Sequence, residues 1–209
     1  MSSSNKILQI YKSRKNILDI LDTYQGYTIT DYEKFSINEI DAMYTNNQLD
    51  MLLTHKTENK KTYIKYYLTA KQIRPQNLEN IIEDLFYVEN ILTKNDTLVI
   101  IIEEEPNDTI ISKLEYLYNH DGIFVVIHNI RRLQFNILNH SLVPEMTVLN
   151  DTESEAVMKK YNLSGLKQLP DIGRFDPVAL ALSMRPNQIG EIKRSSVTAL
   201  MTTFYRVCI

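Results

Sequence analysis

The chain has 209 residues, of which 44% are hydrophobic and 23% are charged, and this is enough for one or two domains with a core of their own. A net charge of -3 excludes a surface that attracts nucleic acid everywhere, and a single cysteine, Cys208, excludes an internal disulfide or a zinc ribbon and fits a reducing compartment. The chain starts without the apolar stretch of a secretory signal, and its longest apolar runs have five residues, so we expect no membrane partner.

The first part of the chain alternates between helical and strand patterns. Residues 5–24 place apolar side chains at helical spacing, with Arg14 inside the apolar stripe, and residues 36–44 suggest a second short helix. The chain then predicts a strand, a helix, a strand, a helix and a strand at 61–68, 75–90, 97–102, 107–119 and 122–127. This alternation implies a small, mostly parallel α/β sheet, so we expect a first domain over residues 1–134.

The remaining residues, 135–209, predict a compact α+β domain. "QFNILNHSLVPEM" (134–146) suggests a strand that runs into an extended proline turn. Residues 151–162 suggest a short helix, because acidic residues occupy its first turn and basic residues its last. "IGEIKRS" and "TTFYRVCI" predict two strands, which we expect to be antiparallel.

Between these elements lies "LPDIGRFDPVALAL", which runs from Leu169 to Leu182. Each proline fixes its own φ and removes a backbone donor, and the residues before them, Leu169 and Asp176, are pushed out of helical geometry. We therefore expect a stiff, bent connector that is neither a helix nor a central strand.

Motifs for catalysis and cofactor binding are weak. The sequence has no glycine-rich nucleotide loop, and its four histidines form no metal-binding pair, so we expect no cofactor, no metal and no catalytic residue. The triplet Glu103, Glu104 and Glu105 ends a predicted strand; a cation site is possible there, and a solvated strand end is the more common reading.

One catalytic pattern has to be weighed. Asp171 is followed by Glu191 and Lys193, and two-metal nucleases often use an aspartate and then a Glu-x-Lys strand, where the carboxylates hold Mg²⁺ and the lysine stabilises the attacking water or the developing charge. The same Glu-x-Lys pattern also occurs at Glu58 and Lys60. Aspartate is also common in turns, because its side chain forms hydrogen bonds with the nearby backbone. A divalent-metal nuclease is therefore the alternative function.

The C-terminal motifs carry a resemblance to a known family. In order, they fall on His140–Pro144, Leu169–Ile172, Asp176–Ala179, Gly190–Arg194 and Tyr205–Cys208. This part of the chain resembles the H subunit of archaeal RNA polymerase and the module that ends the fifth subunit of eukaryotic polymerases. An acidic residue at position 171 departs from the family pattern, which indicates that the nuclease-like sequence pattern is accidental.

The N-terminal part resembles the jaw domain of the eukaryotic fifth subunit. "SRKNILDILDTYQGYTIT" is similar to the first helix and its glycine turn, with Gln25 where arginine is usual, and "GIFVVIHNI" is similar to a jaw strand. After Ile130 the family's Thr-Pro-Ser-Ala turn and helix are missing, and "RRLQFNIL" follows at once. A trimmed jaw of this kind resembles homologues in large cytoplasmic DNA viruses, so we expect a viral protein in host cytoplasm and virion, with the nucleus as the alternative.

The resemblance implies a non-catalytic subunit of a multisubunit DNA-dependent RNA polymerase. It implies that the C-terminal module docks on the largest subunit near the omega-like sixth subunit, and that the jaw lines the path of downstream duplex DNA. The motif residues that we expect at the docking surface are His140, Leu142, Val143, Pro144, Leu169, Pro170, Asp176, Pro177, Tyr205 and Arg206.

Two expectations concern charged side chains. Weak, sequence-independent DNA contacts are expected from Lys12, Arg14, Lys15, Arg131 and Arg132. The alternative is that both lysines lie on a solvated helix face and that Arg14 pairs with a carboxylate. For Arg206 we consider two arrangements equally: an outward-facing docking contact, or an internal salt bridge to Asp171 or Asp176.

Overall fold

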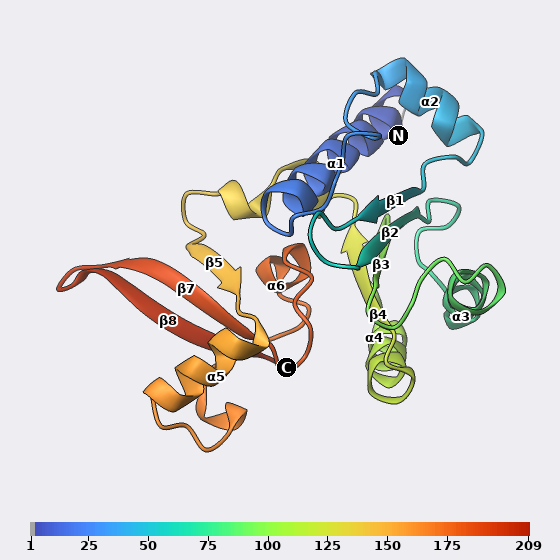
Figure 1. Cartoon of the computed structure of the whole chain (residues 1–209). Helices are drawn as coiled ribbons and strands as arrows, with labels where there is room; N and C mark the ends of the chain where they lie inside the picture. The colour runs from blue at the N-terminus through green and yellow to red at the C-terminus, as the bar shows by residue number, and fades with distance from the viewer. Residues whose placement is uncertain (1–2) are drawn as a thin grey trace. The chain divides into compact units, whose positions relative to one another are not determined.

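The computed structural model describes residues 3–209 and divides into two compact units, Met1–Asn136 and Ile137–Ile209, which we call the N-terminal unit and the C-terminal unit (Figure 1). This division falls two residues after the expected boundary. No helix of residues 3–209 is long and apolar enough to cross a membrane. The helices and mixed sheets confirm the predicted fold class, an α/β unit followed by a compact α+β unit.

The N-terminal unit is built on a four-stranded sheet in the order β1-β2-β3-β4, in which only the β1–β2 pair is antiparallel. Every residue of β3 and β4 is buried, because helices cover both faces of a parallel sheet. The strands are β1 (Met51–Thr54), β2 (Lys61–Tyr66), β3 (Thr97–Ile102) and β4 (Phe124–Asn129). The sequence pattern missed β1, which is only four residues long.

Two helices of the N-terminal unit begin at expected residues, one at Pro75 and the other directly after the capping residue Asn107. α1 (Ser3–Thr23) packs against the sheet, and its Ser13 hydroxyl lies 3.2 Å from the Tyr66 hydroxyl of β2. Gly26 ends this segment with a φ of +73°, which glycine adopts without strain. The other elements are α2 (Ile37–Thr45), α3 (Pro75–Ile82), α4 (Asp108–Tyr116) and η3 (Arg132–Gln134), with π-helical ends at η1 (Glu83–Val88) and η2 (Leu117–Asp121).

The C-terminal unit contains a sheet in the order β5-β7-β8-β6, with β6 parallel to β8 and the other pairs antiparallel. Its elements are η4 (Ile137–Asn139), β5 (Glu145–Val148), α5 (Asp151–Lys160), η5 (Leu166–Gln168), β6 (Asp171–Ile172), α6 (Pro177–Ala181), β7 (Ile189–Ser196) and β8 (Leu200–Cys208). The antiparallel pairing of the last two strands confirms that prediction.

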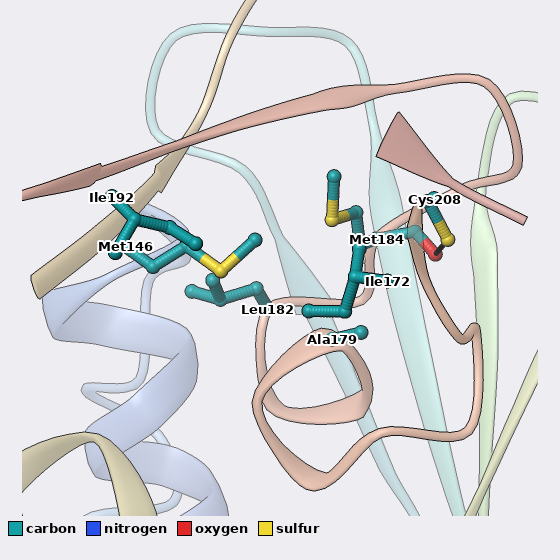
Figure 2. Packing of buried hydrophobic residues seen from close by; sticks show 7 residues of the cluster. All are labelled: Met146, Ile172, Ala179, Leu182, Met184, Ile192 and Cys208. Atoms are coloured by element: carbon teal, nitrogen blue, oxygen red, sulfur yellow. Dashed lines mark hydrogen bonds between the residues drawn. The ribbon is translucent and has the colours of Figure 1, made fainter. Parts of the chain in front are cut away.

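Side chains from the two faces of this sheet form two separate clusters, because successive strand residues point to opposite faces. On the α6 side the buried cluster contains Met146, Ile172, Ala179, Leu182, Met184, Ile192 and Cys208 (Figure 2). On the α5 side Val157 packs with Leu149 and Ile189. Burial raises the pKa of the Cys208 thiol to about 11, so this cysteine behaves as a core residue.

Two expectations for this unit were wrong. Residues 134–144 contain short 3₁₀ turns and no strand, and β5 starts only at Glu145, directly after Pro144, which has no N–H for a sheet ladder. The segment Leu169–Leu182 contains a short helix, α6, where only a connector was expected. Asp176 accepts a hydrogen bond from the Val178 N–H at 2.9 Å and Pro177 occupies the first helical position, so this Asp-Pro pair starts a helix.

We predict that stability falls as the pH drops, because of His128. Burial in β4 lowers the pKa of His128 to about 4, with a smaller contribution from the charge of Arg132, whereas an unfolded histidine has a pKa of about 6.5. Between these two values the unfolded chain takes up a proton that the folded chain does not, so up to about 3 kcal/mol of unfolding free energy is lost on acidification. Urea unfolding at pH 7 and pH 4.5 measures this loss.

His128→Gln should reduce that pH dependence even if it lowers stability overall, because the substitution removes the contribution of His128 to the slope. His140→Gln, at an exposed position in the C-terminal unit, is the matched control. An unchanged slope in His128→Gln would contradict this assignment.

We also predict that residues 135–209 fold alone. This fragment includes both clusters and all four strands of the C-terminal sheet, so its core is complete. Dispersed amide signals in its NMR spectrum are the expected result, and collapsed signals typical of an unfolded chain would refute an autonomous module.

Candidate functional site

The C-terminal unit has a groove of about 240 Å³ over the α6 side of its sheet. Its apolar surface comes from all four strands, from α6 and from the two residues before β5, and its charged groups are one aspartate and two arginines. The lining residues are Val143, Pro144, Met146, Ile172, Asp176, Val178, Ile192, Arg194, Phe204 and Arg206. Four of the ten expected docking residues therefore meet in one groove: Val143, Pro144, Asp176 and Arg206.

An aromatic ring between two arginines marks one wall of the groove. Cζ of Arg194 lies 5.2 Å and Cζ of Arg206 lies 5.7 Å from the centroid of the Phe204 ring. The strand register explains this arrangement, since Gly190, Ile192 and Arg194 lie opposite Arg206, Phe204 and Thr202 on the same face. Arginine above an aromatic ring keeps its donors free for planar anions.

Arg206 adopts neither of the two expected arrangements in full. Its Nη1 donates a 3.1 Å hydrogen bond to the main-chain carbonyl of Asp171, so the expected salt bridge to a carboxylate of Asp171 or Asp176 is wrong. Asp176 instead uses its carboxylate to cap α6. Arg206 is only half-buried, and it lines the groove.

Two other expected docking residues, Leu169 and Tyr205, lie on the opposite face of the sheet. Both pack against the α5 cluster. The Tyr205 hydroxyl donates to Glu191 at 3.1 Å, and partial burial together with this carboxylate raises the pKa of Tyr205. These two residues support the core and do not reach the groove.

The remaining docking candidates shape turns at the surface. Nδ1 of His140 accepts a 3.2 Å hydrogen bond from the Leu142 N–H, which leaves the Leu142 side chain 85% exposed. The Pro170 carbonyl accepts a 2.9 Å bond from the Val207 N–H, and Pro177 starts α6. Sequence reasoning missed Arg194 and Phe204 as groove residues, although their two-residue spacing from Ile192 and Arg206 placed them on this face.

The expected nuclease residues do not come together. Asp171 lies on β6 and Glu191 on β7, with β8 between them, so their strands are about 10 Å apart. Two carboxylates on one Mg²⁺ each need an oxygen about 2.1 Å from the ion. Lys193 lies 3.9 Å from Glu145 of β5, and Glu191 is bonded to Tyr205. The nuclease alternative is therefore not supported.

In the N-terminal unit, four of the five expected DNA-contact residues are exposed. η3 packs along α1, where the Asn16 side chain donates to the Leu133 carbonyl at 2.8 Å. Lys12 lies four residues before Asn16, so it shares this side of α1 with the exposed Arg131 and Arg132. Nε of Arg132 donates to Glu105 at 2.8 Å, which offsets part of its charge. Lys15 is exposed elsewhere on the helix.

The expected DNA contact of Arg14 is wrong, because Arg14 is only 2% exposed. Its Nη1 donates a 2.8 Å hydrogen bond to the Leu49 carbonyl, and its Cζ lies 5.7 and 5.4 Å from the ring centroids of Tyr32 and Phe35. Burial lowers the pKa of Arg14. The expected carboxylate partner is replaced by a carbonyl and two aromatic rings, which explains an arginine in an apolar stripe.

The glutamate triplet after β3 is neutralised residue by residue. Glu103 pairs with Lys6 at 2.8 Å, Glu105 with Arg132, and Glu104 lies 3.9 Å from Lys71. Within residues 3–209, no group of three or more histidine, cysteine or acidic side chains is placed to hold a metal ion. The triplet therefore forms surface ion pairs at the end of a strand.

These features indicate the class of protein. A shallow apolar groove with an aromatic ring and arginines at its edge is typical of a surface that binds another protein. Residues 135–208 match the family described as RNA polymerase Rpb5, C-terminal domain.

Individual relatives extend this match. The chain is 42% identical over 76 residues to DNA-directed RNA polymerase subunit Rpo5 of Thermococcus kodakarensis, which covers 36% of this chain and 92% of the relative. It is 23% identical over 206 residues to DNA-directed RNA polymerase V subunit 5A of Arabidopsis thaliana, covering 93% of this chain and 88% of the relative. The chain belongs to the family of RNA polymerase fifth subunits. Because these relatives come from an archaeon and a plant, the expected viral origin stays a prediction.

Proposed function

We propose that the chain is a non-catalytic subunit of a multisubunit DNA-dependent RNA polymerase that acts in assembly and in guiding downstream DNA. The observation that carries this proposal is the match of its C-terminal residues to nearly the whole length of an archaeal polymerase subunit. A further match along almost the whole chain, to a plant polymerase subunit, extends the proposal to the N-terminal unit.

The C-terminal unit docks on the largest subunit, beside the omega-like sixth subunit. The groove over α6 supports this role, because its walls are held by a sheet and by a helix that starts at a capped Asp-Pro pair. A surface that is already rigid loses little conformational entropy when it binds, and this favours permanent assembly.

The groove also indicates what it binds. Met146, Val178, Ile192 and Phe204 provide apolar contact, and Arg194 and Arg206 stand at the same wall. A segment with an apolar side chain next to a carboxylate fits this combination, since the arginine fork bonds a carboxylate through two parallel hydrogen bonds.

The N-terminal unit lines the path of downstream duplex DNA through weak phosphate contacts. Lys12 and Arg131 are exposed on the side of α1 where η3 packs, and they support such contacts, whereas Arg132 shares its charge with Glu105. The subunit works where its polymerase transcribes: in the host cytoplasm and the virion if the chain is viral, and in the nucleus if it is a nuclear subunit.

We predict that Arg206→Ala weakens incorporation into polymerase and changes the melting temperature of the free chain little. Within the chain the side chain donates a 3.1 Å hydrogen bond to the main-chain carbonyl of Asp171, and the loss of one such bond costs little fold stability. Loss of an arginine from an interface lowers binding roughly tenfold or more. The measurement is copurification of the tagged full chain with the largest subunit. The control is Lys159→Ala, at an exposed position of α5.

Two outcomes would count against the docking proposal. One is a wild-type chain with which no polymerase subunit copurifies. The other is an Arg206→Ala chain that melts well below the wild type and assembles normally, because that result makes Arg206 an internal residue.

We predict that Lys12→Glu and Arg131→Glu each lower the affinity of assembled polymerase for downstream DNA. Each phosphate contact that is lost should reduce the slope of log K against log salt by about 0.9. Lys94→Glu is the matched control, because Lys94 is exposed in the loop before β3, at the opposite end of the strands from Arg131. Unchanged processivity and downstream protection in both jaw variants would contradict the DNA role.

A further inference from the structure

The hairpin of β7 and β8 extends beyond the rest of its sheet. β5 pairs with β7 only as far as Lys193, and β6 pairs with β8 only at Val207 and Cys208. The β7–β8 register nevertheless continues to Ser196 opposite Leu200, so the outer part is a two-stranded ribbon (Figure 1). A two-stranded ribbon on its own is marginally stable in water, so a third element would stabilise it.

Three large apolar side chains lie at the end of this ribbon and have no core of their own. Val197 is fully exposed, and the exposed fractions of Leu200 and Met201 are 84% and 60%. We call these three residues the hairpin tip. Single exposed apolar residues are common, but three within five positions at the end of a projecting element form a patch.

The backbone of Leu200 shows that the ribbon itself does not favour leucine there. Leu200 has a φ of +58° and is the first residue of β8, directly after the three-residue loop 197–199. Glycine is the residue that fits such a left-handed conformation without strain, because it has no Cβ. A leucine here accepts backbone strain and exposes its side chain, so neither backbone geometry nor core packing explains it.

The charge of the ribbon distinguishes between the two classes of partner that it could have, a nucleic acid or a protein. Residues 195–202, which include the hairpin tip, contain no charged side chain, and the cations Lys193 and Arg194 lie at the base of the ribbon. Ribbons that bind nucleic acid need cations beside the phosphates. An uncharged apolar tip fits an apolar socket on a protein.

We propose that the hairpin tip inserts into an uncharged apolar socket on the polymerase subunit that receives the C-terminal unit. This inference rests on the proposed function and adds a second contact to it. Arg194 connects the two sites, since it lines the groove and begins the free part of the ribbon. The partner is thus held by the groove through an apolar and anionic segment, and by the hairpin tip through apolar contact alone.

The test uses the full chain, coexpressed with the largest subunit from the same source. Leu200→Gly should keep or raise the melting temperature of the free chain, since glycine relieves the strain at a positive φ. The same variant should lower the affinity for the largest subunit about tenfold, as expected when a buried leucine side chain is removed. Val197→Ser should lower it without touching the strained position, and Thr198→Ser in the same loop is the matched control.

The outcomes are distinguishable from those for the proposed function. If the wild-type chain fails to bind the largest subunit, the proposed function is wrong. If the wild type binds and both tip variants bind equally well, the socket inference is overturned and the function stands. The inference would also be overturned if the tip variants bound the largest subunit normally but the assembled polymerase lost affinity for DNA, because the tip would then contact nucleic acid. A wild-type chain that sediments as a dimer, with tip variants that sediment as monomers, would overturn it as well.

Discussion

The C-terminal unit depends on one strand, β8, that is hydrogen-bonded along both edges. β7 pairs with it along one edge, and β6 pairs with its last residues along the other. The chain end is bonded as well, since the Ile209 N–H donates to the Ile172 carbonyl at 3.0 Å and the Ile209 carbonyl accepts from the Arg174 N–H at 2.8 Å. A terminal strand normally frays unless its backbone groups are paired, and here they are.

The alternation of β8 then distributes the chemistry of the unit between two faces. Phe204, Arg206 and Cys208 point to the α6 side, where Cys208 enters the core and the other two line the groove. Tyr205 points to the α5 side and bonds Glu191. A shift of one residue in register would exchange these faces, so the pairing that ties down the chain end also fixes the composition of the groove.

Long and strongly periodic elements were predictable, and short ones were not. The patterns at 97–102 and 107–119 indicated β3 and α4, because buried strands are continuously apolar and amphipathic helices repeat every three to four residues. β1 has four residues and α6 has five, too few for a periodic signal. Asp176 and Pro177 carried the local signal for α6, since an aspartate before a proline also starts a helix, and only packing decided between the two readings.

By itself, the sequence determined the fold class and the motifs that place the chain among polymerase fifth subunits, because periodicity, caps and turn residues are local properties. The tertiary structure decided which motif residues share a surface. It separated Tyr205 from Arg206, added Arg194 and Phe204 to the groove, and buried Arg14 between Tyr32 and Phe35. Those outcomes depend on contacts between residues far apart in the chain, and the spacing of residues along one segment does not specify its partners.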